Sequence, residues 1–244
     1  MRLDIYLSVF GLARSRTNAS NLIKMGLVNV NDVPEFKTAR EICASDSVSV
    51  ATSNNFASLG GIKLQKALEY FSINVENKIA IDIGASNGGF TDVLLKAGIA
   101  KVYAVDVSKC ALPPEIKNDS RVFVKDSLNA RYIEFEDIGI KADIVTVDVS
   151  FISLKLILPV LLQFLKHDSI IITLIKPQFE VGRKNLNKHG MVTNSAIAEK
   201  AVSDIISFGS SLGLLACGNI PAPHPFADKN KEYLALFRAC INLN

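Results

Sequence analysis

The residues best suited to do chemistry are an acid and a lysine that each end a strongly apolar stretch. Asp148 follows the run 144–147, and Lys176 follows the run 170–175. Such runs are typical of buried parallel strands, whose carboxyl ends meet at one edge of a sheet, so we expect the two side chains to lie close together. A lysine beside a carboxylate in such a place can exchange a proton with a substrate. The alternative is a lysine whose ammonium simply extends to water.

A glycine-rich turn after an earlier apolar run indicates a site for a nucleoside-containing cofactor. Residues 79–83 predict a strand, and residues 91–95 predict the helix that continues from the turn. Small residues between them let a ligand approach the backbone. The expected cofactor contacts in this region are Asp82, Gly84, Ala85, Ser86, Gly88, Gly89 and Phe90, with Asp148 at the neighbouring strand end.

Two further acids follow later strands and extend the expected cofactor site. Asp106 ends the run 102–105 and is suited to accept hydrogen bonds from both ribose hydroxyls of an adenosine. Asp126 follows the run 122–124, and we expect its carboxylate near the adenine amino group, although an exposed loop acid would show the same pattern. Three residues separate the first two glycines of the turn, unlike the spacing of dinucleotide enzymes that bind pyrophosphate. S-adenosylmethionine, which has no phosphate, fits this spacing better.

The elements that position these residues form one repeating series. Apolar runs alternate with helix-like segments, which predicts a doubly wound, Rossmann-like α/β sheet. Open sheets of this kind bind ligands at the carboxyl ends of their strands, where the residues above fall. The runs lie at 79–83, 102–105, 122–124, 144–147, 170–175 and 212–220.

The first fifty residues predict a separate small α+β module of two helices and short strands. Ser15 or Thr17 can cap the second helix, and Gly26 is well placed to end it. Basic side chains around that helix, Arg14, Arg16 and Lys24, could meet RNA phosphates, although a solvated helix face would look the same. We divide the chain into a domain at 1–50, a linker at 51–59 and a second domain at 60–244.

Composition excludes several other classes of protein. The net charge of +3 permits a polyanionic partner without requiring one. The four cysteines lack metal-ligand spacing, so we expect buried free thiols in the cytoplasm, with no disulfide framework and no metal. The N-terminus is unlike a signal peptide, and polar residues and a proline interrupt the apolar segment 154–165, so no membrane span is expected.

Five motifs, in order along the chain, resemble the TlyA, or hemolysin A, family. Residues 1–50, which include Ser15-Arg16 and Gly26-Leu27-Val28, also resemble the alpha-L RNA-binding motif of ribosomal protein S-four type. The resemblance thus covers nearly the whole chain. The five motifs are Gly-Gly-Ile-Lys-Leu at 60–64, the glycine loop at 82–92, Asp-Val-Ser-Phe-Ile-Ser-Leu at 148–154, Lys-Pro-Gln-Phe-Glu at 176–180 and Asn-Lys-Glu-Tyr-Leu at 230–234.

This resemblance implies an FtsJ-like, class I S-adenosylmethionine-dependent methyltransferase that modifies ribose 2'-hydroxyls of ribosomal RNA. It implies a cytidine target and a substrate within ribosomal subunits. It also places the family's catalytic tetrad on Lys63, Asp148, Lys176 and Glu232, with Lys176 as the base. This sequence departs from the family pattern at Leu59, where arginine is usual, at Asn87 and at Ala227-Asp228-Lys229.

Three alternative functions stay open at this point. A nicotinamide-dependent oxidoreductase could use the same type of loop, although the glycine spacing disfavours it. A membrane-active hemolysin would need an amphipathic cationic helix or a spanning segment, which the sequence does not indicate. An RNA-binding protein that no longer catalyses is disfavoured by the complete tetrad.

Overall fold

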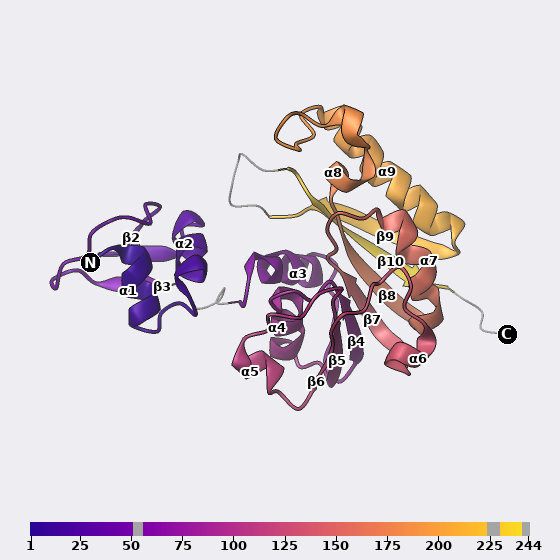
Figure 1. Cartoon of the computed structure of the whole chain (residues 1–244), viewed down its shortest axis with the longest axis horizontal. Coiled ribbons are helices and arrows are strands. Elements are labelled where there is room, and N and C mark those ends of the chain that lie inside the picture. The colour runs from indigo at the N-terminus through magenta and orange to yellow at the C-terminus, as the bar shows by residue number, and fades with distance from the viewer. Residues whose placement is uncertain (51–55, 224–229, 241–244) are drawn as a thin grey trace.

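The computed structural model describes residues 1–50, 56–223 and 230–240, and these form a small N-terminal domain beside a large α/β domain (Figure 1). Residues 51–55 of the expected linker 51–59, and the departure at Ala227-Asp228-Lys229, lie outside the described residues. In the described part of the chain, no helix is both long and apolar enough to cross a membrane.

The small domain packs two helices against a three-stranded antiparallel sheet. Helices α1 (Leu3–Val9) and α2 (Arg16–Lys24) precede β1 (Val28–Val30), β2 (Val33–Pro34) and β3 (Val48–Val50), in the sheet order β2-β1-β3. The Ser15 side chain accepts a hydrogen bond from the Asn18 amide, so Ser15 is the N-cap of α2. Gly26 ends this helix with a φ of +69°. The expected helices, cap and short strands are thus confirmed.

The large domain is built on a seven-stranded sheet with the order β6-β5-β4-β7-β8-β10-β9. The five strands from β6 to β8 in this order are parallel, and they coincide with apolar runs of the sequence. Strands β10 and β9 complete one edge in antiparallel orientation. The strands are β4 (Ile79–Ile83), β5 (Lys101–Val105), β6 (Val122–Lys125), β7 (Ala142–Val147), β8 (Leu165–Ile175), β9 (Leu214–Pro221) and β10 (Tyr233–Ala239).

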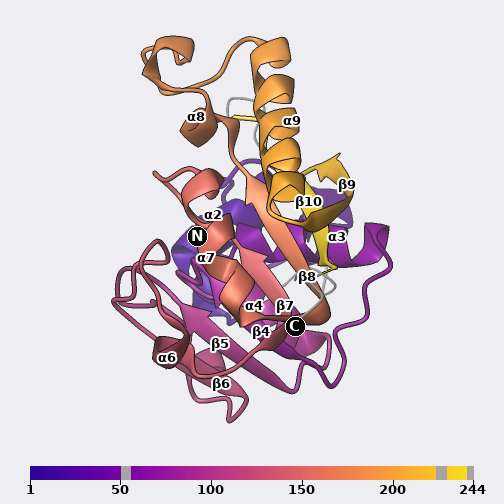
Figure 2. The same ribbon diagram turned by 90° about the vertical axis from the view of Figure 1, so that its right-hand side faces the viewer.

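Helices cover both faces of this sheet and give the domain two separate cores. One face packs against α3 (Leu59–Tyr70), α4 (Gly89–Lys96) and α5 (Pro114–Lys117), which lie on the side of the small domain (Figure 1). The other face packs against α6 (Phe135–Ile138), α7 (Leu158–Leu161) and α9 (Ser195–Ser211), and α8 (Pro177–Glu180) follows β8 directly (Figure 2). The expected doubly wound α/β sheet is confirmed.

Strand β10 is an element that the sequence analysis did not predict. Its residues are buried on both sides of the sheet, so they form a continuous apolar run with no alternation. Such a short run of leucine, alanine and aromatic residues cannot be distinguished from a buried helical segment by periodicity. Its antiparallel pairing with β8 sets Tyr233 opposite Ile175.

The expectation of buried cysteines is wrong for three of the four thiols. Cys110 is buried, whereas Cys43, Cys217 and Cys240 are exposed, and all four are free. Exposure follows from their places in a small-domain loop and at the outer antiparallel edge of the large sheet.

The buried aromatic ring of β10 provides a test of this sheet edge. Phe237 is fully buried, and its ring packs so closely on Gly209 of α9 that an added Cβ would lie 2.5 Å from it. We expect Phe237→Ala to lower the free energy of unfolding by about 3–5 kcal/mol through lost burial and a residual cavity. Urea unfolding measures the loss, with the exposed neighbour change Arg238→Ala as control. Equal, small effects of the two changes would contradict the position of β10 in the core.

Candidate active site

The glycine turn lies at the carboxyl ends of the paired strands β4 and β7, against the residue that follows β7. Gly84 has a φ of +84°, and a Cβ on it would overlap the carbonyl oxygen of Asp148. A Cβ on Gly89 would overlap the Ser58 hydroxyl that caps α3. Glycine is therefore required at these two positions even without a ligand, because other atoms of the protein occupy the space that a side chain would need. Gly88 is the N-cap of α4, with a φ of +80°.

Asp82 lies below this turn and points into the domain. Its side chain is 0% exposed, and its two oxygens accept hydrogen bonds from Thr91 at 2.7 Å and Thr146 at 2.8 Å. Burial raises the pKa of Asp82 to about 6, against the partial opposition of the two threonine hydroxyls. The structure thus places Asp82 differently from the expected ligand contact, since it cross-links β4, α4 and β7.

Asp106 directly follows β5 and lines a cleft of about 520 Å³ at the carboxyl edge of the sheet. Backbone amides of Ser86 and Ser108 donate to its two carboxylate oxygens, each at 2.9 Å. The glycine turn and the loops after β5 and β7 form the rest of the wall. Among the described residues, the cleft lining includes two carboxylates and no lysine or arginine. The lining residues are Gly84, Ser86, Val105, Asp106, Val107, Ser108, Leu128, Asn129, Ala130, Asp148, Val149, Ser150, Phe151, Ile152 and Ile157.

Asp126 follows β6, as expected, and fixes the loop beside Asp106. Its carboxylate accepts a hydrogen bond from the Cys110 amide at 2.6 Å, and this bond lowers the pKa of Asp126 below its usual value. Burial raises the pKa of the Cys110 thiol to about 12, so the thiol stays protonated. In the described structure, Asp126 therefore holds the loop that carries Cys110.

Lys176 and Asp148 meet at the adjacent ends of β8 and β7. Lys176 Nζ lies 2.7 Å from Asp148 Oδ1 without the alignment of a hydrogen bond, and it donates instead to Ser150 Oγ at 2.8 Å. The expected proximity of the two residues is thus confirmed. Both line a hollow of about 140 Å³ that shares Gly84, Ser86, Asp148 and Ser150 with the larger cleft, and its other lining residues are Ser58, Gly60, Ala85, Asn87, Gly89, Phe90 and Lys176.

Lys63 and Glu232 form a second lysine–carboxylate pair. Lys63 Nζ lies 2.5 Å from Glu232 Oε2, and both side chains are largely buried. Lys63 projects from the first half of α3, and Glu232 immediately precedes β10. Because Tyr233 pairs with Ile175, Glu232 and Lys176 lie at the same level of neighbouring strands. The four tetrad positions thus form two ion pairs, one across β7 and β8 and one between α3 and the start of β10.

The three basic residues expected to meet RNA have different surroundings. Arg16 pairs with the buried Asp4 at 2.9 Å, and its side chain is 60% exposed. The Arg2 guanidinium also bonds Asp4 and lowers the pKa of this carboxyl to about 2. Lys24 lies in the last turn of α2. Arg14 instead crosses to the large domain, where it pairs with Asp92 and Glu115.

Sequence reasoning missed several residues of the cleft wall. Ser108, Leu128 and Asn129 lie in loops with no periodic pattern, so only the fold brings them to the site. Phe151 was part of a quoted motif but had no assigned role. Its side chain is 91% exposed, it contacts the Phe179 ring with centroids 5.1 Å apart, and its φ is +64°. A bulky residue in this backbone conformation is a rare and costly feature that clusters at functional sites.

A parallel sheet with a glycine turn after one strand, an acid after the next and a lysine–aspartate pair at the following strand ends defines a nucleoside-cofactor enzyme of the methyltransferase type. Residues 56–239 match the model of the family described as FtsJ-like methyltransferase. The chain therefore belongs to the FtsJ-like methyltransferase family.

Named relatives match almost the full chain. Hemolysin A of Brachyspira hyodysenteriae is 40% identical over 238 residues, which cover 97% of this chain and 99% of that protein. The 16S/23S rRNA (cytidine-2'-O)-methyltransferase TlyA of Mycobacterium tuberculosis is 38% identical over 97% of this chain and 89% of its own length. A solved structure from Streptococcus thermophilus that carries the name hemolysin is similar with a TM-score of 0.75, at 36% identity over 98% of this chain and 88% of that chain.

The buried carboxyl of Asp82 predicts a specific pH dependence of stability. Its folded pKa of about 6 lies above the ordinary 3.8, so the folded protein binds this proton more tightly than the unfolded chain does. Stability from this group is therefore complete below about pH 4 and is lost as pH rises through 6. Asn can replace the protonated carboxyl between the two threonines, so Asp82→Asn is expected to remove this loss, on the order of 3 kcal/mol.

Urea unfolding of the wild type and Asp82→Asn between pH 4 and 8 measures this effect. The difference between the two proteins isolates Asp82, because the other titrating groups are common to both. A difference that does not change with pH would contradict the buried, raised-pKa carboxyl.

Proposed function

We propose that the protein transfers a methyl group from S-adenosylmethionine to the 2'-hydroxyl of a cytidine in ribosomal RNA, in the cytoplasm and within a ribosomal subunit. The observation that carries the proposal is the Lys176–Asp148 pair at the end of a cleft suited to an adenosine. The family and the relatives named for rRNA (cytidine-2'-O)-methylation support the same reaction.

The chemistry of the cleft fits S-adenosylmethionine better than a dinucleotide. Asp106 presents a carboxylate at the strand end, where ribose hydroxyls can donate to it. The described lining carries two carboxylates and no basic side chain, so it suits a cofactor that bears a sulfonium cation and no phosphate. A nicotinamide dinucleotide would bring two phosphates to the same acidic wall. This argument disfavours the oxidoreductase.

S-adenosylmethionine supplies a methyl group on a positively charged sulfur, and a ribose hydroxyl can take that methyl once its proton leaves. In the proposal, Lys176 first gives up its ammonium proton to solvent, and the neutral Nζ then accepts the hydroxyl proton. The ribose oxygen forms the new bond to the methyl group while the bond between sulfur and that methyl breaks, and the sulfur keeps the electron pair as the leaving group. Asp148 and Ser150 hold the nitrogen in place at 2.7 and 2.8 Å. Lys63 and Glu232 hold each other at the same level of the sheet edge and position the ribose.

The proposed division of labour assigns RNA binding to residues 1–50 and catalysis to residues 60–244. Arg16 and Lys24 lie on or beside the exposed surface of α2, where cations can meet phosphate. Asp4 bridges Arg2 and Arg16, so two guanidinium groups are held on one surface of the small domain. We propose that this surface binds a structured RNA while the target nucleotide enters the cleft.

The change Lys176→Ala tests the proposed base. We expect the rate of methyl transfer to ribosomal subunits to fall about 100-fold or more, which is typical of losing a general base. Binding of S-adenosylhomocysteine should change by less than about threefold, because Lys176 interacts with the proton in flight more than with the bound cofactor. Transfer of radiolabelled methyl under single-turnover conditions measures the rate, and calorimetry measures the affinity.

Lys166→Ala is the matched control for this experiment. Lys166 pairs with Asp143 at 2.8 Å, so the same two strands carry a second lysine–aspartate pair at the end away from the cleft. This control should keep its rate. An unchanged rate in Lys176→Ala, or an equal loss in both variants, would remove the base from the account.

A further inference from the structure

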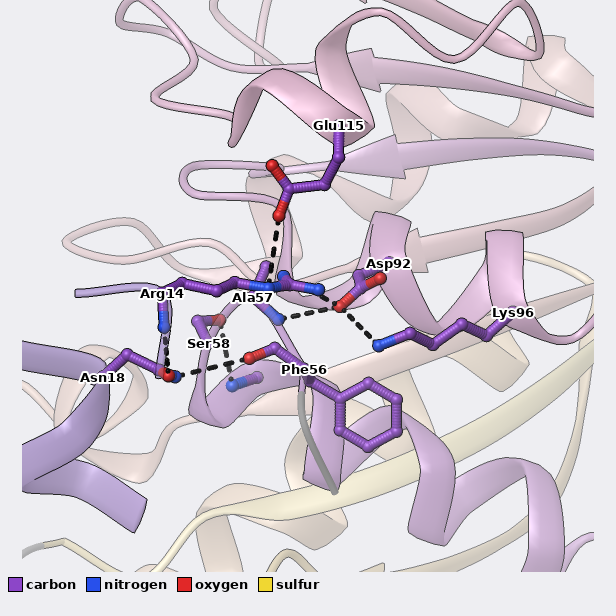
Figure 3. Close-up of polar contacts among 9 residues, drawn as sticks. Arg14, Asn18, Phe56, Ala57, Ser58, Asp92, Lys96 and Glu115 are labelled. Atoms are coloured by element: carbon purple, nitrogen blue, oxygen red, sulfur yellow. Dashed lines mark hydrogen bonds and ion pairs between the residues drawn. The ribbon is translucent and has the colours of Figure 1, made fainter. Parts of the chain in front are cut away.

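One buried carboxylate joins the small domain, the connecting segment and the cofactor loop. Asp92 lies in the first turn of α4, directly after the glycine turn, and its side chain is 6% exposed. Its Oδ2 atom receives three donors: Arg14 at 3.2 Å, the Ala57 amide at 2.8 Å and Lys96 at 3.0 Å (Figure 3). Hydrogen bonds from donors to an ionised carboxylate are shorter and stronger than those between neutral groups, so Asp92 holds these three donors together.

The small domain contacts this carboxylate through residues at the start of α2. Arg14 immediately precedes the α2 cap, its side chain is 25% exposed, and it reaches both Asp92 and the more exposed Glu115 (Figure 3). The buried Asn18 accepts a hydrogen bond from the Arg14 amide at 3.3 Å, and its own amide donates to the Phe56 carbonyl at 3.5 Å. The helix that carries the RNA-facing cations is thus tied to the chain that enters the large domain.

The segment held by Asp92 forms part of the active-site wall. Phe56 is buried against α3, and Lys96 covers its ring at 4.7 Å. One residue beyond Ala57, Ser58 caps α3 and packs against Gly89. Ser58 and Gly60 line the hollow that also contains Asp148 and Lys176. A shift of Ala57 would therefore move this wall and the start of the helix that carries Lys63.

We propose that the Arg14–Asp92 ion pair is an interdomain latch that sets the wall of the cofactor site according to how the RNA-binding domain is seated. Arg14 is then a positioning residue rather than an RNA contact. The inference rests on the proposed function for its cofactor and RNA, whereas the latch itself is a property of the two domains. When the small domain places Arg14 on Asp92, the Ala57 amide keeps its hydrogen bond to the same carboxylate. When Arg14 leaves, Ser58 and Gly60 become more mobile.

The physical cost of breaking the latch follows from its burial. Removing Arg14 leaves Asp92 buried with one of its two cationic partners gone, and replacing Asp92 by Asn leaves Arg14 beside a neutral group. Either change should free the connecting segment. Because both act on one interaction, their effects should not add.

The test combines cofactor affinity with domain geometry in the full chain. We expect Arg14→Met and Asp92→Asn each to weaken S-adenosylhomocysteine binding about tenfold, and the double variant to be no weaker than the weaker single one. Arg40→Ala, a matched change of an arginine that pairs with Glu35 within the small domain, and Glu115→Gln, which alters the exposed contact, should stay within about twofold of wild type.

Spin labels on the exposed Cys43 and Cys217, in a Cys240→Ser background, report the distance between the domains without any cofactor. We expect a narrow distribution that broadens in Arg14→Met and Asp92→Asn and is unchanged in Arg40→Ala. Unchanged distances in both latch variants, or affinity losses that multiply in the double variant, would overturn the latch. A wild type that binds no S-adenosylhomocysteine would instead contradict the proposed function, and the distances alone would then decide.

Discussion

The close approach of β4 and β7 at the carboxyl edge of the sheet is the constraint on which the rest of the site depends. Gly84 faces the Asp148 carbonyl with no room for a side chain, and the turn it begins leads into α4. Beneath it, the buried Asp82 bonds Thr91 of α4 and Thr146 of β7. This arrangement places Asp148 beside the cofactor turn, and the parallel pairing of β7 with β8 then brings Lys176 to it.

From this edge the site extends outward in two directions. On one side, Asp106 and the loops after β5 and β7 form an acidic cleft whose charge disfavours a phosphate group. On the other side, the antiparallel β10 carries Glu232 to the level of Lys176, where Lys63 of α3 meets it. Because α3 begins just after the segment held by Asp92, the same geometry connects the Lys63–Glu232 pair to the contact that the small domain makes with Asp92. In the proposed function, the cofactor cleft, the base and the RNA-binding surface are therefore connected through directly contacting elements.

The sequence predicted the features that local pattern determines. The strand-end positions of Asp106, Asp148 and Lys176 follow from apolar runs, and the α2 cap follows from local chemistry. Strand β10 was missed because burial on both faces removes its alternation. Partners that are distant in the sequence could not be predicted either. Arg14 is the type of residue that contacts phosphate, yet it forms an ion pair with a carboxylate 78 residues away. Asp82 likewise lies near a strand end that suits ligand contact, but the hydroxyls of two threonines from other elements donate hydrogen bonds to its carboxylate.

If Lys176 and Asp148 direct a methyl group to a ribose oxygen, the RNA atom that carries the new methyl group must be a ribose 2'-oxygen. Ribosomal subunits from a strain lacking the enzyme can be treated with the protein and S-adenosylmethionine, and the RNA digested with alkali and analysed by mass spectrometry. The account predicts one new alkali-resistant dinucleotide whose added methyl lies on the ribose of a cytidine. A methyl group on a base, with every ribose unmodified, would contradict it.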